Sequence, residues 1–563
     1  MKRLLITVGA VILIMFSGGN GIAAPSAHRS THKAIPSAAR RITKSPAIPG
    51  STYALVAWGE LGMHCIDGKD YSVFSVLPPY NTIHAQLMKT AEPPTLITSG
   101  VTITYQATTD TTGSFNSSSA GKTNFWDNAA VLFLANLAPE TGLVGYQTQS
   151  STPYLMTYNS TEGYWEAVGI PTVPYDDKGN FNPYPMAQIV AKDLSGNVLA
   201  TAKIVLAVSD EMSCKTCHVS GSDVNAQPAS GWVNNPDPAK DVKFNILKKH
   251  DDRWPISKYL TQLKTNGYTY KSSLYQTAMG GTPVLCAACH SDNALGVAGI
   301  TGIRPLTTDM HGLHGKQILL STGTTLDQNS KTNDLNSCYL CHPGAVTQCK
   351  RGAMNTQLCA ACHGTLTMVG NATRTGWLDE PSCQMCHNNS LRYTSTFTSK
   401  GVWRQTQDQT FATNPNVPLT GKNLYRYSTG HGDLFCSACH GSQHAEFPSL
   451  QANDNVLPTK LQGYAARITE CGACHSTPPI TPTGGPHGLH TIGQTWVNEG
   501  GHQAYVEAYG YQSCAYCHGV KYNGSFLSQA KVKRSFVVEG ASKSFPALHQ
   551  FTCYDCHNGP NGG

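Results

Sequence analysis

Hydrophobic and polar positions alternate along much of the chain between residues 51 and 208. An alternation with a period of two is typical of strands that bury one face. The residues Ser195-Gly196-Asn197 separate the last two alternating segments and favour a hairpin turn. We therefore predict an all-β, sandwich-like domain over residues 51–208, either immunoglobulin-like or an antiparallel domain of another topology. The expected strands are Val101–Gln106, Ala129–Leu137, Tyr154–Tyr158, Tyr164–Ile170, Met186–Asp193 and Ala200–Ser209.

The pattern changes at residue 209. Beyond it, regular periodicity is weak, and Gly, Pro, Ser and Asn interrupt the chain repeatedly. Of the 20 cysteines, only Cys65 lies before this point. We predict a loop-rich, mostly irregular domain with short helices over residues 209–563. A region with so many cysteines and so little periodic apolar sequence indicates that a cofactor, and not a conventional core, organises it.

The first 50 residues follow a third pattern. Two basic residues precede the apolar run Leu4–Phe16, and small residues follow it. This order is typical of a secretory signal peptide, which we predict over residues 1–24. Residues 25–50 are rich in Ala, Ser and Pro and are predicted to be a flexible leader or linker. The apolar run is shorter than the roughly 20 residues of a membrane helix, so no membrane span is expected. The mature chain is expected to be extracellular or on the outer surface, with the periplasm as the alternative.

Nine times the chain reads Cys-x-x-Cys-His. Two cysteines three positions apart on one tight turn can both reach the vinyl groups of one haem edge, and the next histidine can then bind the iron. A zinc ribbon needs two cysteine pairs per metal and no histidine directly after them. The motif therefore predicts nine covalently attached haem c groups. The cysteines are Cys214 and Cys217, Cys286 and Cys289, Cys338 and Cys341, Cys359 and Cys362, Cys383 and Cys386, Cys436 and Cys439, Cys471 and Cys474, Cys514 and Cys517, and Cys553 and Cys556. The expected proximal ligands are His218, His290, His342, His363, His387, His440, His475, His518 and His557.

Eleven more histidines lie outside both the motifs and the leader and are candidates for the second axial position. They are His64, His84, His250, His311, His314, His431, His444, His487, His490, His502 and His549. Nine are needed, so two are spare. The pattern His-Gly-Leu-His occurs twice, at His311 and at His487. Positions i and i+3 share one face of a helix, so such a pair can serve two neighbouring haems.

Iron with imidazole on both faces has no open position and exchanges electrons with little rearrangement. Low reduction potentials are expected because no methionine ligand is implied. This favours an electron-transfer protein without catalytic residues. The alternative is a multihaem oxidoreductase with one open haem that acts on nitrite, hydroxylamine or a sulfur oxyanion. Such enzymes often carry Lys in place of the motif histidine, and none of the nine motifs does.

Cys65 and Cys349 are left outside the motifs. In an oxidising compartment, two remaining cysteines suggest a disulfide, which would join the predicted β domain to the haem domain. Separate buried thiols are the alternative, because sequence does not show whether the two are close.

The formal net charge is +6, but the cations are scattered and form no basic stripe. Two propionates on each of nine haems would also make the holoprotein more acidic than its sequence. We therefore expect no nucleic-acid partner.

Four stretches of the chain resemble one family. They are Trp58–Leu87 (WGELGMHCIDGKDYSVFSVLPPYNTIHAQL), Tyr425–Pro448 (YRYSTGHGDLFCSACHGSQHAEFP), Gly484–Val497 (GGPHGLHTIGQTWV) and Cys514–Ser528 (CAYCHGVKYNGSFLS). In these the chain resembles the large secreted multihaem c-type cytochromes of dissimilatory metal-reducing bacteria. The stretches cover the edge of the N-terminal domain and parts of the C-terminal third.

The resemblance implies export to the outer surface and electron delivery to extracellular acceptors such as metal oxides, electrodes and other cytochromes. Some members of the wider group polymerise into haem-lined filaments, so self-assembly is a possible property of this chain. The resemblance also supports His431, His444, His487 and His490 as axial ligands, because they fall inside the matching stretches.

Overall fold

The computed structural model describes most of the chain after residue 51. The described residues are 52–212, 214–377, 380, 425–427, 429, 431–477, 486 and 489–560. The predicted signal peptide and leader lie outside them, as do Cys383, Cys386, His387 and His487.

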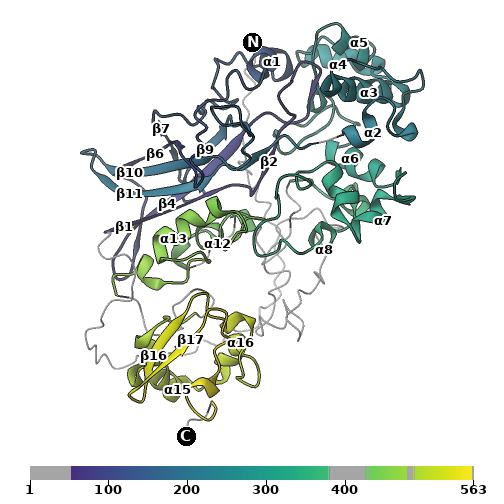
Figure 1. The fold of residues 1–563 in the computed structure, drawn as a ribbon. Helices are drawn as coiled ribbons and strands as arrows, with labels where there is room; N and C mark the ends of the chain where they lie inside the picture. Colours follow the sequence, from purple (N-terminus) through teal and green to yellow (C-terminus); the bar gives the residue numbers. More distant parts are fainter. Residues whose placement is uncertain are drawn as a thin grey trace, which may run out of the picture.

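Two antiparallel sheets form most of the N-terminal region (Figure 1). The first sheet has the order β1 (Tyr53–Gly59), β4 (Asn81–Lys89), β9 (Tyr164–Ile170) and β8 (Thr157–Asn159), and β5 (Thr95–Ile97) also pairs with β4. The second sheet has the order β11 (Val198–Val205), β10 (Met186–Asp193), β6 (Val101–Thr108) and β7 (Tyr154–Leu155). The region is therefore β-rich, as the alternating pattern predicts.

The two sheets share one apolar core. Ile83 of β4, Ile103 of β6 and Ile189 of β10 are each 0% exposed and belong to the same cluster. Leu457, from the much later helix α13 (Val456–Gln462), joins this cluster. Burying each such side chain contributes roughly 1.5–3 kcal/mol of apolar stabilisation, so this core favours packing of the two sheets on each other.

Several strands have the predicted bounds. The predictions Tyr164–Ile170 and Met186–Asp193 are confirmed by β9 and β10. The hairpin turn is confirmed too: the Asp193 N–H donates to the Asn197 carbonyl at 3.0 Å, and Gly196 has φ +87°, which favours glycine. The predicted strand Tyr154–Tyr158 divides between β7 and β8, which belong to different sheets.

The predicted strand Ala129–Leu137 is wrong, because this segment begins inside the helix α1 (Phe125–Leu132). A continuous apolar run does not distinguish a buried strand from a buried helix. The buried residues Phe125, Ala129 and Leu132 are spaced four and three apart, which places them on one helical face.

The strands β1 and β4 were not expected from the alternation. β4 is buried on both faces, and its buried positions include Thr82, His84 and Gln86, so polar and apolar residues do not alternate along it. One face lies on the shared core. On the other side, a second cluster joins Trp58 and Met88 to later residues such as Phe435.

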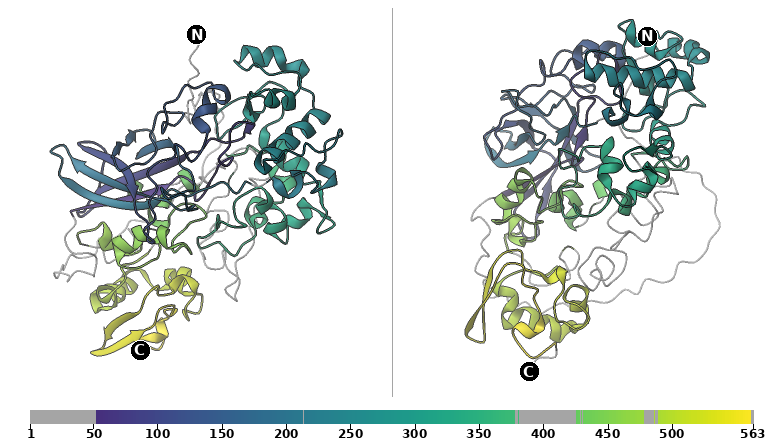
Figure 2. Two further views of the ribbon diagram at one scale, coloured as in Figure 1. Left: turned by 45° about the horizontal axis from the view of Figure 1, so that its top comes forward. Right: turned by 45° about the vertical axis from the view of Figure 1, so that its right-hand side comes forward.

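The structure packs across the predicted domain boundary at residue 208 (Figure 2). The helices α3 (Pro238–Arg253), α4 (Leu260–Thr265) and α5 (Leu274–Met279) share a core with Tyr71 and Phe125. Two short parallel pairings also cross the boundary. They join β12 (Val208–Ser209) to β2 (His64–Cys65) and β13 (Val284–Leu285) to β3 (Phe74–Ser75).

The remaining described elements are short. The helices are α2 (Lys215–His218), α6 (Leu306–His314), α7 (Leu326–Ser330), α8 (Cys359–His363), α9 (Leu366–Val369), α12 (Cys436–His440), α14 (Gln494–Val497), α15 (Ala504–Tyr509) and α16 (Ala515–His518). The hairpins are β14 (Ile318–Leu319) with β15 (Thr324–Thr325), and β16 (Arg534–Val538) with β17 (Ala541–Phe545). Among the described residues, no helix combines the length and the apolar character needed to cross a bilayer.

Candidate haem-binding sites

Each of the eight described Cys-x-x-Cys-His motifs lies on a single helical turn. In five of them, the histidine N–H donates to the carbonyl of the first cysteine four positions earlier, at 2.8–3.2 Å. The other three include α8, α12 and α16, which end at the motif histidine. One turn places residues i, i+3 and i+4 on the same face. Both thiols and the imidazole therefore project from one side of the turn, as attachment of one haem requires.

Seven motif histidines face a histidine from elsewhere in the chain. The pairs are His218 with His314, His290 with His250, His342 with His311, His363 with His444, His475 with His431, His518 with His490, and His557 with His502. Every pair joins a predicted proximal ligand to a predicted distal candidate, and no two motif histidines pair with each other among these seven.

The spacing within the pairs fits one metal ion between the two rings. A metal lies about 2 Å from an imidazole nitrogen, and the centre of a five-membered ring with bonds near 1.35 Å lies about 1.15 Å from each ring atom. Two rings on opposite sides of one ion should thus have centres about 6.3 Å apart. The seven distances between ring centres are 5.9–6.5 Å.

Hydrogen bonds hold many of these rings by Nδ1 and leave Nε2 directed elsewhere. The Nδ1–H of His290 donates to the Arg304 carbonyl at 2.8 Å, and that of His518 donates to the Phe551 carbonyl at 2.9 Å. The rings of His311, His314, His490 and His502 also bond to backbone carbonyls through Nδ1. Metal-bound histidines are typically oriented in this way by an acceptor on the other ring nitrogen.

Burial keeps several paired rings in the neutral form that binds a metal. It lowers the pKa of His218, His311, His444 and His490 to about 4, and in His218 the neighbouring His314 adds to this shift. Each of these rings is therefore ready to bind a metal at neutral pH without first losing a proton.

Helix α6 serves two motifs at once. Its His311 faces His342 of the third motif, and its His314 faces His218 of the first motif. The two rings are one turn apart, and each bonds through Nδ1 to the carbonyl four residues earlier on the same helix, Thr307 or Met310. The His-Gly-Leu-His pattern therefore fixes the first and third sites relative to each other.

Thiols of different motifs also lie close together. Burial raises the pKa of the Cys474 thiol to about 12, and the neighbouring Cys439 adds to the shift. Likewise, the neighbouring Cys214 adds to the raised pKa of the Cys341 thiol, and Cys553 adds to the raised pKa of the Cys514 thiol. The first motif thus adjoins the third, the sixth adjoins the seventh, and the eighth adjoins the ninth.

The third and fourth motifs meet at Asp334. A carboxylate oxygen of Asp334 and the Sγ atoms of Cys338 and Cys359 all lie within 4.8 Å of one another. This group does not form a separate metal site, because Asp334 already accepts bonds from Lys350 Nζ at 2.6 Å and from the Cys359 N–H at 3.1 Å. It joins the turns of the third and fourth Cys-x-x-Cys-His motifs at their cysteine edges.

Three predicted distal ligands lie away from the seven pairs. His64 and His84 are buried in the β-rich region at 2% and 4% exposure, where His64 contacts Tyr80 and His84 stacks on Tyr164. Nε2 of His549 forms a hydrogen bond with a carboxylate oxygen of Asp555, at 2.9 Å. No described motif histidine faces any of the three. The fifth motif, with His387, and the candidate His487 lie outside the described residues.

Cys65 and Cys349 are both free thiols in the structure, not joined by a disulfide. Burial raises the pKa of both thiols, to about 11 for Cys349, and Cys349 is among the causes of the shift at Cys65. Cys349 also lies beside an axial candidate, with its Sγ 3.9 Å from Nδ1 of His444.

The sequence did not reveal the residues that orient the rings of the paired histidines. Most are backbone carbonyls, which no side-chain pattern reveals. Glu92 is the exception: its carboxylate is 2.9 Å from Nδ1 of His475, across 383 positions of sequence. Arg351 was also missed; its buried guanidinium binds Asp454 at 2.6 Å and donates to the Gly62 carbonyl, so it joins both regions.

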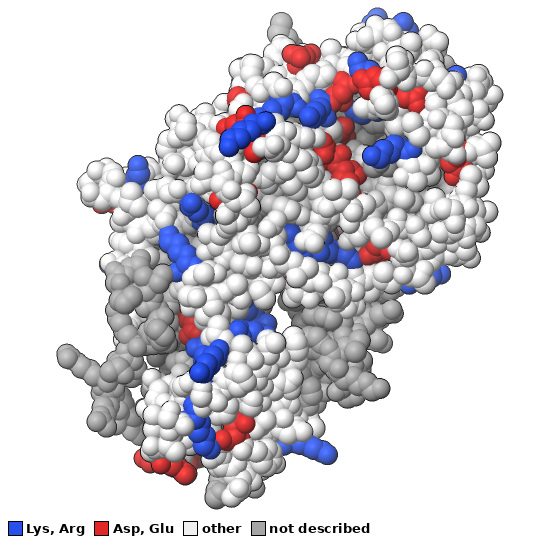
Figure 3. All heavy atoms as spheres, in the orientation of Figure 1, with Lys and Arg blue, Asp and Glu red and all other residues white. Residues whose placement is uncertain are grey.

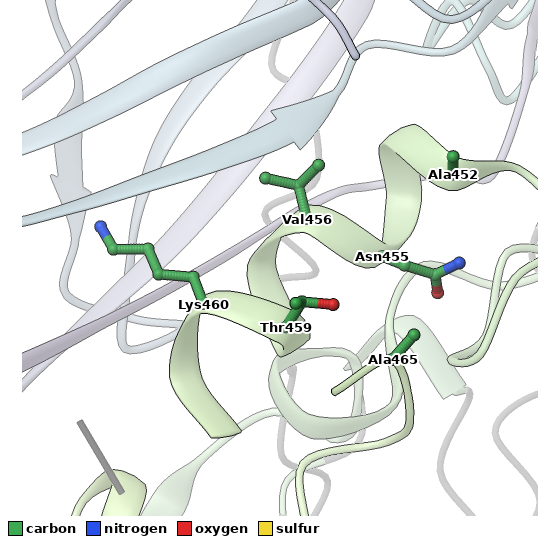
Figure 4. A pocket seen from close by; sticks show the side chains of 6 residues that line it. All are labelled: Ala452, Asn455, Val456, Thr459, Lys460 and Ala465. Carbon is green, nitrogen blue, oxygen red and sulfur yellow. The ribbon is translucent and has the colours of Figure 1, made fainter. Parts of the chain in front are cut away.

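A shallow pocket beside α13 contains none of the motif residues (Figure 4). It is lined by Ala452, Asn455, Val456, Thr459, Lys460 and Ala465. Its one charged group, Lys460, donates to the carbonyl and hydroxyl of Thr201. The residues that line this pocket include no His, Cys, Asp or Glu. On the molecular face of Figure 3, the cationic side chains are dispersed, with acidic ones among them near the top.

Comparison of this chain with models of protein families, with curated proteins and with solved structures finds no match in any of the three.

Proposed function

We propose that this protein is a multihaem c-type cytochrome that carries electrons through nine covalently bound haems, each with two histidine ligands. The observation that supports the proposal best is the set of seven histidine pairs. Their ring centres lie 5.9–6.5 Å apart, close to the about 6.3 Å that one metal ion between two imidazoles requires. In each pair, one histidine directly follows two cysteines that are spaced for thioether attachment.

The residues of this chain would hold and shield the haems. The paired cysteines attach each haem covalently, the motif histidine binds one face of its iron, and the paired histidine binds the other. The Nδ1 bonds to carbonyls fix the rings, so that the ligand geometry changes little when an electron arrives. When bound, haem would supply the one-electron centre.

Adjacent attachment turns support transfer from site to site within the protein. The first and third sites share α6, and the third and fourth meet at Asp334. Export and delivery of electrons to extracellular acceptors, such as metal oxides, electrodes or other cytochromes, are parts of the same proposal. They rest on the signal-peptide pattern and the family resemblance of the sequence.

The test is haem content and coordination of the purified, secreted chain. A pyridine haemochrome assay should give nine haems per chain, and the spectrum of the reduced protein should be low-spin and unaffected by carbon monoxide. A colourless protein would refute the proposal. Nine haems with substoichiometric carbon monoxide binding would instead favour an oxidoreductase with one open haem.

A further inference from the structure

The hydrogen-bond partners of the paired histidines differ in charge. Six of the described rings bond through Nδ1 to neutral backbone carbonyls. His444 has the sulfur of Cys349 at 3.9 Å. His475 differs from these, because its Nδ1 lies 2.9 Å from a carboxylate oxygen of Glu92.

A second acidic side chain, that of Asp309, lies near a paired ring, but its contact with that ring is longer than the contact between Glu92 and His475. An oxygen of Asp309 lies 3.4 Å from Nδ1 of His290, beyond a good hydrogen bond, while its other oxygen binds the Arg304 guanidinium at 2.6 Å. The ring of His290 already donates to the Arg304 carbonyl. The negative charge of Asp309 is therefore engaged by a cation, whereas no Lys or Arg among the described residues pairs with Glu92.

The backbone fixes Glu92 against the seventh motif. Its neighbour Ala91 forms a parallel bridge with His475, and the Ser476 N–H donates to the Ala91 carbonyl at 3.1 Å. Ala91 and Glu92 come one residue after the end of β4, a strand buried in the N-terminal sheet. The β-rich region thus presents an acidic side chain to a motif near the other end of the chain.

We infer that Glu92 is a positioning residue that lowers the reduction potential of the haem attached at Cys471 and Cys474. This inference rests on the proposed function. A carboxylate that accepts the Nδ1 proton makes the imidazole more basic and adds negative charge, and both effects favour the oxidised iron. The N-terminal region would then tune one redox site as well as support the fold.

The test uses the holoprotein with Glu92→Gln, which removes the charge and keeps an oxygen acceptor. In a spectroelectrochemical titration, one component of nine should become about tenfold easier to reduce, a rise of about 59 mV for a one-electron couple. Glu92→Asp, which keeps the charge, should stay closer to the unmodified protein than Glu92→Gln does. The matched control is Asp193→Asn at the exposed β10–β11 turn, which removes the same charge and should leave all nine components unchanged.

Ionic strength provides a second measurement. The Glu92 side chain is 42% exposed, so salt should screen its charge. In the unmodified protein the potential of this component should rise with added salt, and the difference from Glu92→Gln should shrink. A purely structural role would not produce this convergence. Nine haems with identical titrations in both proteins at low and high salt would overturn the inference, whereas a protein without haem would overturn the proposed function instead.

Discussion

The β-rich region and the region that contains the Cys-x-x-Cys-His motifs, from Cys214 onward, have different kinds of interior. In the first, side chains such as Ile83, Ile103 and Ile189 fill a shared core between two sheets. In the second, the described helices are mostly single turns, and histidine rings face one another across the gap that a cofactor would fill. The comparison teaches that the first region can fold on apolar burial, while the second, on the proposed function, would need haem to complete its interior.

The largest expected effect comes from withholding haem. We expect the chain made without haem attachment to keep the two sheets and to lose the structure around the described motifs three, four and six to nine. Without haem, no metal would link the two histidines of each pair. Short helices are also only marginally stable on their own. Hydrogen exchange should show β6 and β10 protected, together with α3, which packs on the N-terminal core. Equal protection throughout the apoprotein would contradict the contrast between the two regions.

Removing the buried cation that joins the regions should have the next largest effect. Arg351→Ala leaves the carboxylate of Asp454 buried without its partner, which costs about 3–5 kcal/mol. It also removes the donor to the Gly62 carbonyl. Local opening, measured by hydrogen exchange at Gly62 and around Leu457, should increase accordingly.

Arg351→Lys is the matched control, because it keeps the charge and loses the two-pronged bond to Asp454. Its amide hydrogen exchange at these positions should be intermediate between that of the unmodified protein and that of Arg351→Ala. Equal exchange in all three proteins would mean that this ion pair does not hold the two regions together.

Losing one axial ring should affect a single site and leave the β-rich region intact. His314→Ala removes the ring that faces His218, so one haem of nine should become high-spin and bind carbon monoxide. His549→Ala is the control, since Nε2 of His549 is engaged by Asp555 and no described motif histidine faces it. Magnetic circular dichroism distinguishes the two outcomes. A high-spin haem in His549→Ala would show that His549 is a ligand.

The sequence predicted what local patterns determine. The alternation located β6, β9 and β10, and the Cys-x-x-Cys-His spacing requires a single turn, which the structure contains at the eight described motifs. The sequence could not determine what depends on tertiary contacts. The i, i+3 spacing of His311 and His314 shows that two sites can share a helix, but not that these are the third and first motifs. Nothing in the sequence links Glu92 to His475, and β4 carries no alternation because both of its faces are buried.

The smallest expected effect concerns Cys65 and Cys349, one cysteine from each region. In the structure both are free thiols of intermediate exposure, so the unreduced, denatured protein should take up two alkyl groups. Mass spectrometry counts them directly. If none is taken up without reductant, the two cysteines form a disulfide that links the regions covalently. Closing so long a loop would add on the order of 5 kcal/mol, which is comparable with the cost expected for Arg351→Ala. The protein would then tolerate Arg351→Ala, so the thiol count decides whether the buried ion pair or a covalent bond holds the two regions together.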